Sequence, residues 1–284
     1  MRAFVLSGGG GRGALQAGAL QVLIAQGIVP QLLVGTSVGA LNAAYLAAEP
    51  TPARAEQLIE SWRHVRRRDL FPRTARLLQV ANLLFGADHV FSSTALRRRV
   101  EDALPYRHIE NATVALVVVA TDLRTGTERH LSRGPVVDAV LASAAIPGVF
   151  APVPWGRDLL VDGGVLANVP TQAAIAAGGT ELWVLDTSQP CTNPRPTRNA
   201  IDIALQCLSL SSAARTNAEL ARVPPSVAVH HVPLACARHH RLTDLRATTE
   251  LLTEGATAAR HFLDGSTATT IDPLRLGNGP RFDE

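Results

Sequence analysis

Residues 31–39 read QLLVGTSVG, and this stretch carries most of the information about the fold. Residues 31–34 predict a short buried strand, and residues 38–48, rich in alanine and leucine, predict a helix. Between them lies a G-x-S-x-G pentapeptide, Gly35-Thr36-Ser37-Val38-Gly39. At a strand-to-helix junction this sequence is typical of a nucleophile elbow, a sharp turn that exposes a serine at the N-terminus of a helix. A plain tight turn is the alternative interpretation.

A glycine-rich loop lies upstream, between a predicted strand at residues 2–7 and a predicted helix at residues 13–26. It reads Gly8-Gly9-Gly10-Gly11-Arg12-Gly13. Its backbone N–H groups can point into one cavity beside the positive end of the helix dipole, where a phosphate or the oxyanion of acyl transfer would bind. Strand, helix and strand in this order predict parallel pairing with a right-handed crossover.

The same loop also fits the G-x-G-x-x-G fingerprint of dinucleotide binding, through Gly8, Gly10 and Gly13. That interpretation requires an Asp or Glu about 20 residues further on, at the end of the second strand. The uncharged Val34-Gly35-Thr36-Ser37 stands there instead. A dinucleotide- or phosphate-binding module is therefore the weaker hypothesis, and a glycine turn without a ligand is another alternative.

A third motif, Asp162-Gly163-Gly164, follows a predicted strand at residues 159–161. The two glycines present the carboxylate on a tight turn with little steric shielding. A serine hydroxyl needs a base to become a good nucleophile, and this carboxylate is a candidate. An Asp that bonds only its own turn is the alternative.

Histidines late in the chain could supply the base in an ordinary α/β-hydrolase, where the order is Ser, Asp, His. The candidates are His230, His231, His239, His240 and His261. That fold places its nucleophile after several strands, whereas Ser37 follows only the second predicted strand. The topology of an ordinary α/β-hydrolase therefore fits badly.

The rest of the chain continues the alternation of strands and helices, without an internal repeat. Further strands are predicted at 113–121, 128–131, 182–186 and 227–232, and further helices at 136–145, 201–222 and 242–263. We expect one domain over residues 1–263, with an Arg-rich helical insert at 52–107 that could act as a lid. Residues 264–284 are expected to form an extended tail.

Composition narrows the function classes. The chain has 284 residues, of which 46% are hydrophobic and 18% charged, and this favours one large globular domain. Aromatic residues make up 4%, and the net charge of +3 is only mildly basic, so a nucleic-acid binder is not expected. All 27 basic residues are Arg, which excludes a Schiff-base lysine and a P-loop lysine.

Three widely spaced cysteines, Cys191, Cys207 and Cys236, do not make a disulfide framework, so a cytoplasmic location is expected. The apolar run before the first glycines is too short for a signal peptide. Residues 13–48 are uncharged, but glutamines, glycines and Pro30 interrupt them, so they predict a buried core and not a membrane span.

The glycine loop, the elbow and the Asp motif together resemble the patatin-like phospholipases, a family of serine lipid acyl hydrolases. Residues 142–150 (ASAAIPGVF) and Asn168-Val169-Pro170 also resemble segments of that family, and the match covers roughly residues 2–186. The resemblance implies a three-layer α/β/α sandwich around a mostly parallel sheet. It also implies an acyl lipid substrate and neither a metal nor a cofactor.

The resemblance further implies a catalytic dyad, with Ser37 as nucleophile and Asp162 as general base. The oxyanion would be held by backbone N–H groups of the loop and of the elbow, namely Gly8, Gly9, Gly10, Gly11, Arg12, Gly13 and Val38. The remaining motif glycines, Gly35, Gly39, Gly163 and Gly164, would shape the two turns. Partial burial of Asp162 would raise its pKa and make it a better base.

Two further clusters have mainly structural interpretations. Cys236 and His239 have the spacing of half a metal site, but no second pair follows, so surface or pocket-lining roles are expected. The arginine runs at 63–68 and 97–99 predict solvated helix faces. The functional alternative is peripheral contact with an anionic membrane surface.

Overall fold

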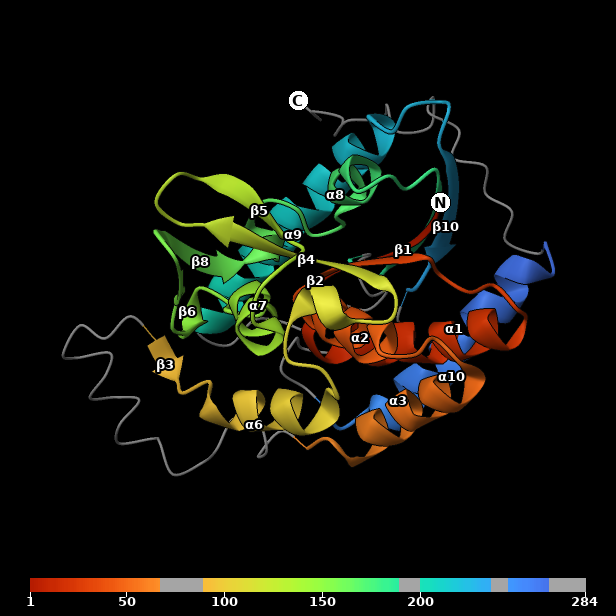
Figure 1. The fold of residues 1–284 in the computed structure, drawn as a ribbon, viewed down its shortest axis with the longest axis horizontal. Coiled ribbons are helices and arrows are strands. Elements are labelled where there is room, and N and C mark those ends of the chain that lie inside the picture. Colours follow the sequence, from red (N-terminus) through yellow and green to blue (C-terminus); the bar gives the residue numbers. More distant parts are fainter. Residues whose placement is uncertain (67–88, 189–199, 236–244, 266–284) are drawn as a thin grey trace, which may run out of the picture.

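The computed structural model describes residues 1–66, 89–188, 200–235 and 245–265. Its central sheet lies between two layers of helices, which makes the fold the expected α/β/α sandwich (Figure 1). The strands of this sheet are β1 (Arg2–Leu6), β2 (Leu32–Thr36), β4 (Ala115–Asp122), β5 (Thr127–Leu131), β7 (Val153–Trp155), β8 (Asp158–Asp162), β9 (Glu181–Asp186) and β10 (Ala228–Pro233).

The sheet order is β10-β9-β1-β2-β4-β8-β7, with β5 paired to β4 beside this path. Strands β10, β9, β1, β2 and β4 run parallel, whereas β8 and β5 are antiparallel to β4, and β7 is antiparallel to β8. The sheet is therefore mostly parallel with an antiparallel edge. A separate two-stranded parallel sheet joins β3 (His89–Phe91) to β6 (Gly148–Phe150).

The helices are α1 (Gly13–Ala25), α2 (Val38–Ala47), α3 (Pro52–His64), α6 (Thr94–Ala103), α7 (Val136–Ser143), α8 (Thr171–Ala176), α9 (Ala200–Ala221) and α10 (Thr248–Leu263). Short 3-10 turns lie at η1 (Gly10–Arg12), η3 (Ile109–Asn111) and η4 (Gly163–Val165). None of the described helices is both long enough and apolar enough to cross a membrane.

Alternate residues of the central strands belong to two different cores, one on each face of the sheet. Phe4 and Leu6 pack in the core with α1, α2, α3, α6, α7 and α10, whereas Ala3 and Val5 pack in the core with α8. Because both faces are covered, the parallel strands are apolar at nearly every position. This explains why the sequence predicts them as continuous aliphatic runs.

The predicted elements are found with end shifts of a few residues, except for the last helix. That helix was expected from residue 242 and is described from Thr248, while residues 242–244 lie outside the described ranges. The short elements β3, β6, β7 and α8 were not predicted. In the Arg-rich insert, α3 and α6 are helical as expected, whereas residues 67–88 and the tail from 266 lie outside the described residues.

One strand brings the elbow and the Asp motif together. Thr36, the last residue of β2, pairs with Val119 of β4, and Asp162, the last residue of β8, pairs with the next residue, Ala120. Strand β5 occupies the other edge of β4 at this level, so β2 and β8 share one edge and meet end to end. The residue after Thr36 is Ser37, which therefore lies beside Asp162.

Candidate active site

Ser37 occupies a strained turn between β2 and α2. Its φ of 55° and ψ of −122° make it the one residue other than glycine with a positive φ among the described residues. Gly35 and Gly39 permit this turn, because a Cβ at Gly35 would overlap the carbonyl of Gly39, and a Cβ at Gly39 would overlap the carbonyl of Leu6. Strain of this kind is held by its surroundings and is common at functional sites.

A buried serine on the neighbouring helix holds the turn in place. The backbone N–H of Ser37 donates to Ser143 Oγ at 2.8 Å, and Ser143 Oγ donates to the carbonyl of Val119 at 2.5 Å. Ser143 is fully buried at the end of α7. It therefore ties the elbow to β4, the strand that also positions Asp162.

Ser37 and Asp162 are in direct contact. Ser37 Oγ donates to Asp162 Oδ2 at 2.7 Å, and the backbone N–H of Gly164 donates to Asp162 Oδ1 at 2.7 Å. Only 7% of Ser37 and 5% of Asp162 is exposed. Burial raises the pKa of Asp162 to about 6, and the hydrogen bonds from Ser37 and Gly164 oppose that rise without cancelling it.

Several backbone N–H groups of the glycine loop are paired within the protein. The N–H of Gly8 donates to the carbonyl of Asn168 at 3.0 Å, and the N–H of Arg12 donates to the carbonyl of Gly9 at 3.1 Å. The N–H of Gly13 bonds within the 3-10 turn. Gly10, in the centre of the loop, lines both of the cavities that contain Ser37.

Buried polar side chains hold the glycine loop in place. Thr187 Oγ1 donates to the carbonyl of Gly8 at 2.9 Å, and Ser7 Oγ accepts from the N–H of Thr187 at 2.8 Å. Arg12 is 7% exposed, and burial lowers its pKa while the charge of Asp186 opposes that effect. The loop is therefore held by buried groups at both of its ends.

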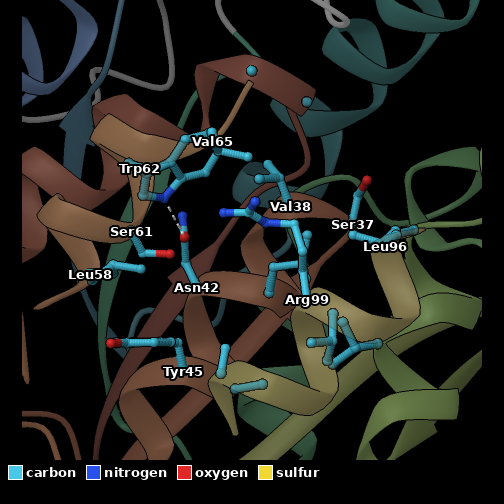
Figure 2. A pocket seen from close by; sticks show the side chains of 18 of the residues that line it. Ser37, Val38, Asn42, Tyr45, Leu58, Ser61, Trp62, Val65, Leu96 and Arg99 are labelled. Carbon is cyan, nitrogen blue, oxygen red and sulfur yellow. Dashed lines mark hydrogen bonds between the residues drawn. The ribbon is translucent and has the colours of Figure 1, made fainter. Parts of the chain in front are cut away.

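Two cavities meet at Ser37. The larger encloses about 170 Å³ between α2, α3 and α6, and its wall is mainly apolar (Figure 2). Trp62 Nε1 donates to Asn42 Oδ1 at 3.0 Å and closes one side of it. The smaller cavity, about 60 Å³, has Arg12, Asp162 and Asn168 among its lining residues.

Several other polar residues have structural surroundings in the part of the chain that the structure describes. Asp122 accepts hydrogen bonds from Thr125, Arg124 and Leu159, which makes it the turn residue at the end of β4. His230 stacks on Trp183 at 4.3 Å between ring centroids. Cys236, His239 and His240 lie outside the described residues, as does Cys191, whereas Cys207 is exposed and free.

Sequence reasoning missed Ser143 and Thr187 as supports of the site. Ser143 is the polar residue in the segment Ala142–Phe150, which the family resemblance had singled out only as a whole. Thr187 follows β9 directly, and β9 pairs with β1, the strand that leads into the glycine loop. A parallel pairing of these two strands therefore indicates that Thr187 lies beside the loop.

Comparisons with known proteins show the family of the chain. A family model described as patatin-like phospholipase matches residues 4–175. Patatin-like phospholipase domain-containing protein 7 of Rattus norvegicus is 28% identical over 186 residues, which are 65% of this chain and 13% of the relative. An uncharacterized NTE family protein of Mycobacterium bovis is 31% identical over 182 residues, or 64% of this chain and 47% of the relative.

Among solved structures, VipD from Legionella pneumophila has a TM-score of 0.48 at 13% identity, over 93% of this chain and 67% of that chain. The family assignment rests on the sequence matches. The chain spans about an eighth of the length of the rat relative and about half of the mycobacterial one.

Proposed function

Because this chain belongs to the patatin-like phospholipase family, we propose that it is a serine hydrolase that cleaves acyl ester bonds of lipids. The observation that carries the proposal is the 2.7 Å hydrogen bond from Ser37 Oγ to Asp162 Oδ2, at the point where the two cavities meet. Phospholipids are the first substrates to test. The family match covers both residues, since it extends from residue 4 to residue 175.

In the first half of the proposed reaction, Ser37 Oγ attacks the ester carbonyl carbon while Asp162 takes the hydroxyl proton. The tetrahedral oxyanion is held by backbone N–H groups of Gly9, Gly10 and Gly11, with the N–H of Val38 at the start of α2. Gly8, Arg12 and Gly13 do not contact the oxyanion in this scheme, because their N–H groups bond within the protein. The C–O bond then breaks, and protonated Asp162 gives its proton to the leaving alcohol oxygen.

In the second half, water attacks the acyl-enzyme. Asp162 accepts a proton from the water as the water oxygen bonds to the acyl carbon. The proton then returns to Ser37 Oγ when the acyl–serine bond breaks. The products are a free fatty acid and an alcohol, and the dyad is restored. The raised pKa of Asp162 supports this role, because a base works best when its pKa lies near the working pH.

The larger cavity is the proposed site for the acyl chain. It begins at Ser37 and follows α2 to Tyr45, which is about 12 Å for eight residues of helix. Leu58 of α3 and Leu96 and Val100 of α6 supply apolar wall. Burial of an acyl chain there would contribute about 0.8 kcal/mol for each methylene group.

Contact with an anionic membrane surface also remains a proposal. Of the residues 66–68, only Arg66 is described, and Arg63 is paired with Glu60. In the second run, Arg98 is exposed and could contact such a surface. Each arginine near an anionic bilayer would contribute roughly 1 kcal/mol of binding.

The proposed dyad can be tested by labelling and turnover. A fluorophosphonate probe should label the wild type and fail to label Ser37→Ala, while Asp162→Asn should remain folded and lose turnover of p-nitrophenyl esters by more than 100-fold. Ser92→Ala, an exposed serine on the surface, is the control and should label normally. Labelling of Ser37→Ala at wild-type rate would refute the assignment.

The same assay separates hydrolysis from acyl transfer. Added glycerol or another alcohol would compete with water for the acyl-enzyme, and the products show which acceptor is preferred. An acyltransferase would give mainly new ester, whereas the proposed hydrolase gives mainly free fatty acid. The dinucleotide-binding alternative predicts instead a thermal shift with NAD or NADP and no labelling of Ser37.

A further inference from the structure

Asn168 is a half-buried residue that lines the smaller cavity together with Ser37 and Asp162. Its backbone carbonyl accepts a hydrogen bond from the N–H of Gly8 at 3.0 Å. None of the hydrogen bonds within the described part of the chain involves its side-chain carboxamide. The carboxamide is therefore available to a molecule that enters the cavity.

Two glycines make room for this carboxamide. A Cβ at Gly8 would lie 2.5 Å from Asn168 Oδ1, and a Cβ at Gly164 would lie 3.0 Å from the same atom. The Cβ at Gly8 would also lie 3.3 Å from Ser37 Cβ, and the Cβ at Gly164 would lie 3.0 Å from Asp162 Oδ1. Side chains at the two positions would thus fill the space between the carboxamide and the dyad. Because both residues are glycines, no side chain from them separates Asn168 from Ser37 or Asp162.

The backbone around Asn168 is held in place. The neighbouring residues Ala167 and Val169 are buried in the core on the α8 side of the sheet. The carbonyl of Ala167 accepts from Thr36 Oγ1 at 2.8 Å, and Thr36 directly precedes Ser37. Asn168 is therefore tied to the same strand end that carries the nucleophile.

The two halves of an ester need different places around Ser37. With the acyl chain in the larger cavity, the alcohol oxygen lies on the side of Asp162, which has to protonate it as it leaves. Water then has to attack from that same side, so that Asp162 can take its proton. The smaller cavity is lined by Asp162 and encloses about 60 Å³, whereas one water molecule needs about 10–15 Å³. This cavity therefore has room for the alcohol oxygen and afterwards for the water.

We propose that Asn168 is a third catalytic residue, which binds the alcohol oxygen of the ester in the smaller cavity and then the water that replaces it. This inference rests on the proposed hydrolysis at Ser37. A carboxamide can do both, because it has N–H donors for the ester or alcohol oxygen and a carbonyl acceptor for water.

The attack of water shows what the carboxamide contributes. One hydrogen of the water moves to Asp162, while a lone pair of the water oxygen forms the bond to the acyl carbon. The other hydrogen donates to Asn168 Oδ1 and remains on the oxygen, where it becomes the hydroxyl of the released fatty acid. With both hydrogens bonded, the water is held in the orientation for attack, which lowers the entropic part of the barrier.

A nitrophenyl ester separates the two halves of the reaction. Nitrophenolate leaves without taking up a proton, so acylation of Ser37 with this substrate needs little help at the leaving oxygen. Deacylation still needs an oriented water. Loss of the carboxamide should therefore slow the second half more than the first, and acyl-enzyme should accumulate.

The test is Asn168→Ala with p-nitrophenyl hexanoate. We expect kcat to fall on the order of 10- to 100-fold, while the first-turnover burst and fluorophosphonate labelling, which use no water, change less than about threefold. The acyl-enzyme at Ser37 should then be visible by mass spectrometry of the intact protein. Asn217→Ala, at an exposed position of α9, is the matched control and should change none of these values.

Asn168→Asp is the second variant, because it keeps the shape of the side chain if the alanine variant does not fold. Its carboxylate would face Asp162, so the pH at which kcat reaches half its plateau should rise relative to the wild type. An unshifted profile would overturn the proposal, as would an unchanged kcat in Asn168→Ala or an equal slowing of burst and steady state. If the wild type neither hydrolyses the ester nor is labelled, the proposed function itself fails. Hydrolysis and labelling of the wild type with any of the other three results reject only the role of Asn168.

Discussion

At the scale of single residues, the environment of Asp162 decides how a carboxylate could act as a base. The side chain is 5% exposed, and its two oxygens accept from Ser37 and Gly164. Burial raises its pKa to about 6, while an ordinary Asp would titrate near 3.8. An Asp with that ordinary pKa would be a much weaker base at neutral pH.

The raised pKa predicts the pH profile of the wild type. Only ionised Asp162 can accept the proton of Ser37, so kcat/KM should rise with pH and level off above an apparent pKa near 6. The measurement is the rate with a p-nitrophenyl ester between pH 4.5 and 8.5. The folded state is checked by circular dichroism at each pH, and a profile that stays flat down to pH 4.5 would contradict the assignment.

The two residues of the proposed dyad were predictable from the sequence, whereas the residue that supports the elbow was not. Ser37 and Asp162 could be predicted because each stands in a glycine motif that follows a strand. Ser143 could not, since it lies among alanines. Only the folded arrangement shows that Ser143 accepts a hydrogen bond from the elbow.

At the scale of elements, the contact between α2 and β1 requires a glycine inside a helix. Gly39 lies in the first turn of α2, and a Cβ there would overlap the carbonyl of Leu6 at the end of β1. This close approach keeps the start of α2 near the glycine loop. Glycine lowers the intrinsic stability of the helix at this position, but it allows α2 to lie close to β1.

Gly39→Ala should accordingly destabilise the protein. In an exposed helix this substitution stabilises by about 1 kcal/mol, whereas here overpacking should lower the free energy of unfolding by about 1–3 kcal/mol. Urea unfolding followed by circular dichroism gives the value. Exposed Ser211→Ala on α9 is the control for helix propensity and should be neutral or slightly stabilising. A higher urea midpoint for Gly39→Ala would disprove the packing argument.

Long elements were predictable and short ones were not. The run 113–121 is aliphatic because β4 is buried on both faces, and this made the strand evident. Strands β6 and β7 have three residues each, too few to show an alternation of apolar and polar side chains. The antiparallel direction of β8 depends on its hairpin with β7, so it was also missed.

At the scale of the whole molecule, the proposed base carries a cost in stability. The pKa of Asp162 is raised from 3.8 to about 6 by folding, so the folded protein holds this proton more tightly than the unfolded chain. The contribution of the protonated group is complete below about pH 3.8 and is lost as the pH rises through about 6. At pH 8 the ionised group should cost up to about 3 kcal/mol of stability.

Asp162→Asn should therefore be more stable than the wild type at pH 8, and the gain should nearly disappear at pH 4. Chemical unfolding at the two pH values measures the difference. Asp122→Asn is the opposite control, because hydrogen bonds lower the pKa of Asp122 and its ionised form is favoured by folding. That variant should lose stability at pH 8. An equal gain for Asp162→Asn at both pH values would refute the electrostatic cost.

The general architecture followed from the sequence because apolar runs alternate with helical patterns along the whole chain. The arrangement of the antiparallel edge did not, although it places Asp162 beside Ser37. Similarly, the packing of α3 and α6 around the larger cavity at Ser37 could not be predicted from their amphipathic patterns. Both depend on contacts between segments that lie far apart in the chain.

The pairing of β2 and β8 with adjacent residues of β4 has a consequence for how this chain can vary. The spacing of Ser37 and Asp162 is set by one peptide unit of β4, between Val119 and Ala120, and not by the loops that connect the three strands. Insertions or deletions in those connections can therefore accumulate while the pair keeps its separation. The segments between them can diverge, while Ser37 and Asp162 stay in register.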